Sequence, residues 1–153
     1  MSEPGSRAYN YSPPEFLNQE SVASALMGET WTWKSARKNV GARLLITNML
    51  VADVHARIGP LTDIQCVNLF LEELRNSHRN FFVATMTRPL VIGQSEHPRF
   101  RWSGENAGRS MTGVLSCGRM KNNYFVIHFS DDVRRATQTF PAIRHSLKTI
   151  SER

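Results

Sequence analysis

The fold is decided by residues 109–150, which read RSMTGVLSCGRMKNNYFVIHFSDDVRRATQTFPAIRHSLKTI. Two apolar segments, 111–117 and 124–129, are separated by a link rich in Gly and Asn. This pattern predicts an antiparallel β-hairpin. Along its second strand Phe125, Ile127 and Phe129 share one face, and the residues between them share the other.

The last part of this stretch has the period of an α-helix. Its large apolar residues fall at steps of three and four, as one helical stripe: Phe140, Ile143, Leu147 and Ile150. Burying four such side chains contributes roughly 6 to 12 kcal/mol as an upper estimate, so we expect the helix to dock on the apolar face of the hairpin. Ser130 is expected to cap the helix, with Asp131 and Asp132 in its first turn, and Pro141 to mark a restart or kink.

Upstream, the clearest helix is predicted over residues 61–77. Thr62 can cap its N-terminus and Asp63 stands in its first turn. Its expected buried stripe consists of Ile64, Val67, Phe70, Leu71 and Leu74. A strand is predicted over residues 30–35, where Trp31 and Trp33 alternate with polar residues and should both face inward.

The fold class expected from these elements is α+β, a mainly antiparallel sheet flanked by helices. Residues 1–14 contain three prolines and no periodicity, which predicts a flexible N-terminal arm, followed by a single α+β domain over 15–153. The other expected elements are a short helix over 16–28, a turn at 39–41, a strand over 43–51 that could also be helical, an ambiguous segment at 54–60, and strands at 81–87, 90–92, 98–103, 110–117 and 122–129.

The charge of the chain is concentrated in its second half. Residues 1–76 hold seven Lys and Arg against eight Asp and Glu, whereas residues 77–153 hold twelve against five. A skew of this kind can mark an acidic partner or nucleic acid, although a solvated basic face is the more common explanation.

Two cysteines, Cys66 and Cys117, are too few for a metal site and lack CxxC spacing. They could pair only if the fold brings them together, which would suit a secreted or periplasmic protein; two unlinked thiols are the favoured prediction. Residues 1–14 contain no hydrophobic signal core, and no run of residues is long and apolar enough to span a membrane. We therefore expect a cytoplasmic protein, with a periplasmic or secreted mature form as the alternative.

The sequence contains no pattern that predicts catalytic, cofactor-binding or metal-ligating residues. The histidines lack the i, i+4 spacing of a zinc helix, and no serine stands in a GxSxG turn. Activation of Cys117 by His128 is conceivable, but an inert thiol is favoured.

One constellation suggests a binding surface. If Phe100 and Trp102 face the core, Arg99 and Arg101 lie on the opposite sheet face, where Tyr124 and His128 would also point if the hairpins pair in sequence order. Basic and aromatic groups interleaved on a sheet are the ingredients of an RNA-binding platform. The partner-binding residues that this hypothesis names are Arg99, Arg101, Arg119, Lys121, Tyr124 and His128.

A family resemblance rests on the order of elements over residues 42–150. The meander, the glycine-led turn, the strand at 124–129 and the closing helix with Phe140, Ile143, Ser146 and Leu147 resemble the Mog1/PsbP-like group, which includes bacterial DcrB-type proteins and secretion-effector chaperones. The resemblance implies an α/β/α sandwich that binds proteins without catalysing a reaction. The basic second half and the Trp31/Trp33 strand depart from the pattern of the group.

We therefore expect a non-enzymatic, protein-binding accessory or chaperone-like module, with a possible link to bacterial secretion. One alternative is a nucleic-acid-binding protein that uses Arg99, Arg101, Arg119 and Lys121. The other is a small enzyme, which would require a deep pocket holding a titratable residue of displaced pKa.

Overall fold

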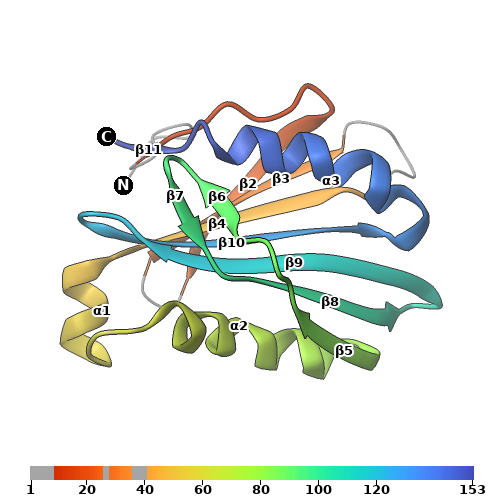
Figure 1. Cartoon of the computed structure of the whole chain (residues 1–153), viewed down its shortest axis with the longest axis horizontal. Coiled ribbons are helices and arrows are strands. Elements are labelled where there is room, and N and C mark those ends of the chain that lie inside the picture. The colour runs from red at the N-terminus through yellow and green to blue at the C-terminus, as the bar shows by residue number, and fades with distance from the viewer. Residues whose placement is uncertain (1–8, 26–27, 36–40) are drawn as a thin grey trace.

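A computed structural model describes residues 9–25, 28–35 and 41–153 of the chain. One seven-stranded antiparallel sheet, in the order β2-β3-β4-β10-β9-β8-β5, forms the centre of the molecule, and helices lie on both of its faces (Figure 1). The strands of this sheet are β2 (Leu17–Ala25), β3 (Gly28–Ser35), β4 (Arg43–Leu50), β5 (Arg79–Thr85), β8 (Arg99–Asn106), β9 (Arg109–Arg119) and β10 (Asn123–Asp132). The α+β class predicted from the sequence is confirmed.

One face of the sheet is covered by α3 (Val133–Leu147), and we call it the α3 face. Phe140, Ile143 and Leu147 are buried against it, and the ring of Phe140 meets that of Phe129 edge-on, with centroids 4.9 Å apart. The docking of the closing helix on the hairpin is thus confirmed. Trp31 and Trp33 are each 1% exposed on the same face, as the alternation of their strand predicted.

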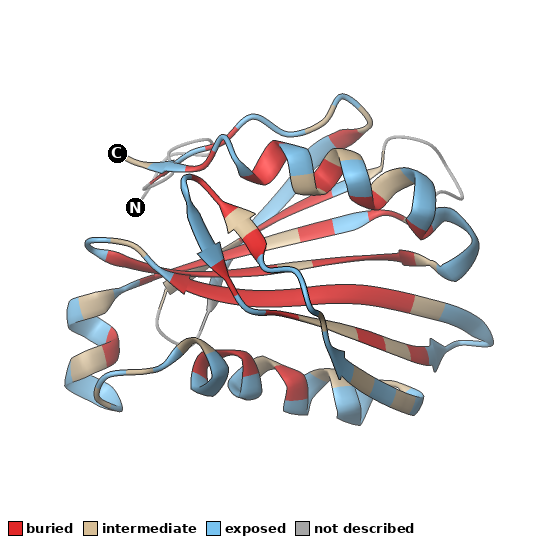
Figure 2. Cartoon of the chain, in the orientation of Figure 1, coloured by how far each residue is buried: buried red, intermediate tan, exposed pale blue. Residues whose placement is uncertain are grey.

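The other face, which we call the α2 face, carries α1 (Val51–Arg57) and α2 (Asp63–Ser77). Thr62 caps α2 as predicted, and its capping box is completed by Gln65. Val67 and Leu71 are buried against the sheet, but Ile64 is 55% exposed, so the predicted stripe is wrong at its first position. The central strands β9 and β10 are buried along most of their length, because helices cover both sides of them (Figure 2).

Cys66 and Cys117 form a disulfide that joins α2 to β9, with Cα atoms 6.0 Å apart. The favoured prediction of two unlinked thiols is therefore wrong. The helix that carries Cys66 packs on the strand that carries Cys117. The two cysteines are 51 positions apart in the sequence, so their spacing alone could not predict this contact.

Two small strand pairs complete the fold. The hairpin β6 (Leu90–Ile92) and β7 (Ser95–His97) packs beside α3, so 90–92 pairs outside the large sheet and does not extend β5. The strands β1 (Tyr9–Asn10) and β11 (Ser151–Glu152) pair near the two ends of the chain (Figure 1). Residues 1–8 of the predicted arm lie outside the described residues. For 9–11 the flexible arm is wrong, because the rings of Tyr9 and Tyr11 are buried in the α3-face core.

Three local predictions need correction, at 16–28, at Ser130 and at Pro141, and one open alternative is decided. The predicted short helix over 16–28 is strand β2, which gains its hydrogen bonds by pairing with β3; residues 26–27 lie outside the described part, as do 39–40 of the predicted turn. The strand predicted over 43–51 is confirmed for 43–50, against its helical alternative, and 51–57 form α1. Asp132, and not Ser130, caps α3, because β10 continues to that residue. Pro141 stands inside α3, on its exposed side.

Candidate functional site

A concavity lies on the α2 face, beside the C-terminal half of α2. Its volume is about 690 Å³. The floor is formed by β4, β10 and β9, and one wall is formed by Phe70, Leu74 and His78 at the end of α2. We call this concavity the α2 cleft. Its size falls in the range of ordinary ligand-binding pockets.

The floor of the α2 cleft is built by strand alternation. Leu45 of β4 stands opposite His128 of β10, and Leu115 of β9 stands on the other side of His128. All three point to the α2 face, together with Val126 two residues earlier. The apolar side chains of Leu45, Leu115 and Val126 thus surround one imidazole in the middle of the floor. Hydroxyl groups are added to the lining by Thr30, Thr47 and Ser130.

Trp102 and His128 form a polar pair inside this apolar floor. Trp102 Nε1 donates a hydrogen bond to His128 Nε2 over 3.1 Å. The indole also packs against His78, at 4.7 Å between ring centroids, and stacks with Phe81 at 6.0 Å. It lies against Gly113, where any Cβ atom would overlap with the indole ring. The position of Trp102 is therefore fixed on several sides.

His128 is neutral at physiological pH. Burial in the cleft floor, followed by the nearby charges of Arg43 and His78, lowers its pKa to about 4. Since an indole nitrogen can only donate, His128 Nε2 must be the accepting nitrogen, which places the proton of the neutral ring on Nδ1. The ring therefore presents one N–H donor and no charge to its surroundings.

Charged groups gather at the rim of the α2 cleft. Arg43 and Arg109 stand on one side, and Glu73 of α2 stands on the other. Arg109 lies 3.8 Å from Asp132, whereas Arg43 forms no ion pair with any described residue. An apolar floor with charges at its edge suits a partner that offers an apolar group surrounded by polar ones.

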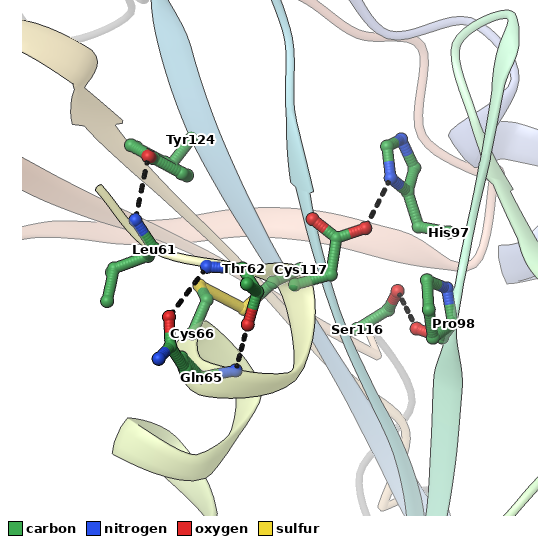
Figure 3. The surroundings of a disulfide bond; sticks show 10 residues. Leu61, Thr62, Gln65, Cys66, His97, Pro98, Ser116, Cys117 and Tyr124 are labelled. Carbon is green, nitrogen blue, oxygen red and sulfur yellow. Dashed lines mark hydrogen bonds and ion pairs between the residues drawn. A yellow bond between two sulfur atoms is a disulfide. The ribbon is translucent and has the colours of Figure 1, made fainter.

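The opposite end of α2 is fixed to the sheet by the disulfide and its surroundings (Figure 3). Tyr124 Oη accepts a hydrogen bond from the backbone N–H of Leu61, and Thr62 and Gln65 close the capping box next to Cys66. Asp63 faces His97 of β7 at 3.3 Å. These contacts hold the start of α2 in place, so the wall of the cleft belongs to a helix anchored at its first turn.

The six residues predicted to bind a partner do not form one platform. Register pairs Arg99 with Ser116 and Arg101 with Val114, which places both arginines on the α3 face. Tyr124 and His128 lie on the α2 face. The predicted shared face is therefore wrong, because Tyr124 and His128 share the α2 face with Phe100 and Trp102, and the two arginines point to the other side.

The remaining two residues lie at the β9–β10 turn. Arg119 pairs with Tyr124 across the hairpin, and its guanidinium lies 5.8 Å from the Tyr124 ring. Lys121 is exposed in the turn itself. Sequence reasoning thus identified His128, but it missed Trp102 as the partner of His128, because that contact depends on the register of β8 against β9.

No group of three or more His, Cys, Asp and Glu side chains lies close enough together to hold a metal ion in the described part of the chain. Within the same residues, no helix is both long enough and apolar enough to cross a bilayer.

No known protein family matches this chain, and no curated protein matches it in sequence. Among solved structures, the fold is similar to the crystal structure of LpqN, a protein involved in cell envelope biogenesis of Mycobacterium tuberculosis. The TM-score is 0.53 at 14% identity, over 97% of this chain and 86% of the other. At this identity the likeness is one of fold alone, so the Mog1/PsbP-like sandwich stays a prediction.

Proposed function

We propose that this chain is a non-enzymatic accessory protein that binds a protein partner through the α2 cleft. The observation that carries the proposal is the cleft itself, about 690 Å³ of space over a stretch of sheet whose centre holds Leu45, Leu115 and Val126. A partner that inserts an apolar side chain there would cover Leu45 and Val126 and meet the Nδ1–H donor of His128. The polar rim would surround the inserted group, as in other protein interfaces.

The chemistry of His128 supports binding over catalysis. A general base works best when its pKa lies near the operating pH, and the pKa of His128 is about 4. Its Nε2 lone pair is also occupied by the Trp102 N–H. The cleft does meet the requirement of the enzyme alternative for a pocket with a displaced pKa, but the direction of that displacement makes His128 a weak base.

The disulfide and the LpqN likeness support a role in the cell envelope. Disulfides form and persist mainly in oxidising compartments such as the periplasm. The Cys66–Cys117 bond therefore favours the periplasmic or secreted alternative over the expected cytoplasmic location. LpqN is described as involved in cell envelope biogenesis. An accessory role of the same kind is compatible with an oxidising compartment.

Site-specific photo-crosslinking in the native source tests the proposal. A photoreactive residue at position 45, on the cleft floor, should yield a protein adduct, and one at position 69, on the exposed side of α2, should not. With the captured partner purified, Leu45→Arg should weaken binding at least tenfold, and the matched Leu69→Arg should change it less than twofold. Equal binding by Leu45→Arg and the unaltered chain would contradict the proposal.

Salt dependence separates this function from nucleic-acid binding. Binding through the apolar cleft should change little between 50 and 200 mM salt. A nucleic acid held through some six phosphates would lose roughly a thousandfold in affinity over the same range. The second result would favour the basic second half of the chain as the binding surface.

A further inference from the structure

A separate group of arginines lies on the α3 face, on the opposite side of the sheet from the α2 cleft. Arg99 and Arg101 are two residues apart on β8 and point to the same face, where they stand beside α3. Arg99 is only 8% exposed, and its Nε is buried without a hydrogen-bond partner. A buried N–H without a partner is costly, because it has given up its hydration and gained no replacement.

Arg101 is held in a fixed position beside Arg99. Its Nε donates a hydrogen bond to Thr112 Oγ1 over 2.9 Å, and its guanidinium lies 5.3 Å from the ring of Phe140. Thr112 Oγ1 donates in turn to the backbone carbonyl of Trp102. These contacts use one of the five N–H groups of Arg101, so the others remain available to a ligand.

Two further arginines complete the group. Arg144 comes from α3, one turn beyond Phe140, and Arg88 comes from the link between β5 and β6. Burial lowers the pKa of Arg99, and the charges of Arg144, Arg101 and Arg88 lower it further, in that order. Among the described residues, none of the four forms an ion pair with a carboxylate. The backbone N–H of Met86, two residues before Arg88, donates to the carbonyl of Arg99, and the Phe140 ring below Arg101 lies one turn before Arg144. Three elements thus bring four positive charges to one region of the α3 face.

We propose that Arg88, Arg99, Arg101 and Arg144 bind a phosphate group on the α3 face. Guanidinium groups present their N–H donors as planar forks that match phosphate oxygens, and they stay charged at any physiological pH. A phosphate monoester brings nearly two negative charges and three acceptor oxygens, which suits several converging arginines. The phosphate belongs to a free anion or to a lipid headgroup, and the experiment separates these sources.

The test measures binding of inorganic phosphate to the full chain by isothermal titration calorimetry, at constant ionic strength maintained with chloride. Arg88→Gln removes one charge at an exposed position where the fold is not at risk, and Arg144→Gln removes one from α3. The matched control is Arg135→Gln, which removes the same charge from the exposed first turns of α3. Each cluster variant should bind about tenfold more weakly, because a hydrogen bond to a charged group contributes about 1.5 kcal/mol or more. The control should bind within twofold of the unaltered chain.

A second titration uses phosphatidylcholine vesicles with and without phosphatidic acid. Binding of inorganic phosphate with the expected variant pattern supports a free phosphate ligand. Binding of the phosphatidic acid vesicles alone, with the same pattern, supports a lipid headgroup. The proposal is overturned if neither probe binds, or if Arg135→Gln weakens binding as much as Arg88→Gln and Arg144→Gln, since net charge would then explain the result.

Discussion

Acidification should destabilise this protein through one residue, His128. In the folded chain its pKa is about 4, against 6.5 for an ordinary histidine. Between these two pH values His128 is protonated in the unfolded chain and neutral in the folded chain. Protonation of His128 therefore leaves the free energy of unfolding unchanged above pH 6.5 and lowers it as the pH falls toward 4. The displacement corresponds to about 3 kcal/mol in the free energy of unfolding.

Urea unfolding at pH 7.5, 6, 5 and 4 measures this effect. The comparison is with His128→Gln, whose side-chain oxygen can still accept the hydrogen bond from Trp102 and whose amide does not titrate. All other titrating groups are common to both proteins, so the difference between their stabilities isolates His128. This difference should shift by about 3 kcal/mol, in favour of the variant, from pH 7.5 to pH 4. Parallel stability curves across this range would refute the placement of a neutral His128 in the cleft floor.

Three further predictions concern stability at neutral pH. Reduction of the Cys66–Cys117 disulfide, which closes a separation of 51 residues, should lower the free energy of unfolding by up to about 4 kcal/mol in a urea titration with and without reductant. Thr62→Ala should cost about 1 kcal/mol in the same assay, through loss of the α2 cap, and a change below 0.3 kcal/mol would contradict the capping box. Gly113→Ala should cost about 1 to 3 kcal/mol and move Trp102 toward solvent, with a red-shifted fluorescence emission; an unshifted spectrum would show that the indole does not lie on that glycine.

Local patterns were enough to predict the central part of the fold. The predicted helical stripe is confirmed at Phe140, Ile143 and Leu147, whereas Ile150 is buried beyond the end of α3. The alternation of Trp31 and Trp33 is confirmed, and both patterns follow from chain geometry over a few residues. The Thr62 cap is equally local, because its hydrogen bonds reach only to Gln65. The alternation of apolar and polar residues gives no strand signal at β2, because its apolar residues are few and irregularly spaced. This strand forms by pairing with β3.

The candidate site could be predicted only in part, because it depends on which strands are neighbours. A period of two says that Arg99 and Arg101 share a face, but it does not say which face, since both faces of this sheet are covered. The sequence also gives no sign that Cys66 lies over Cys117, or that Trp102 reaches His128. These contacts connect elements far apart in the chain and are fixed by the register of the whole sheet.

The β1–β11 pair has a practical consequence for rearranging the chain. Tyr9 lies opposite Glu152 and Asn10 lies opposite Ser151, so the outermost described residues at both ends are neighbours in space. A short glycine linker could join these ends, and new termini could be opened at the exposed β8–β9 turn around Gly108. Such a circular permutant keeps every strand neighbour in the large sheet, and it would carry a fused reporter at the β8–β9 turn, away from the β1–β11 pair.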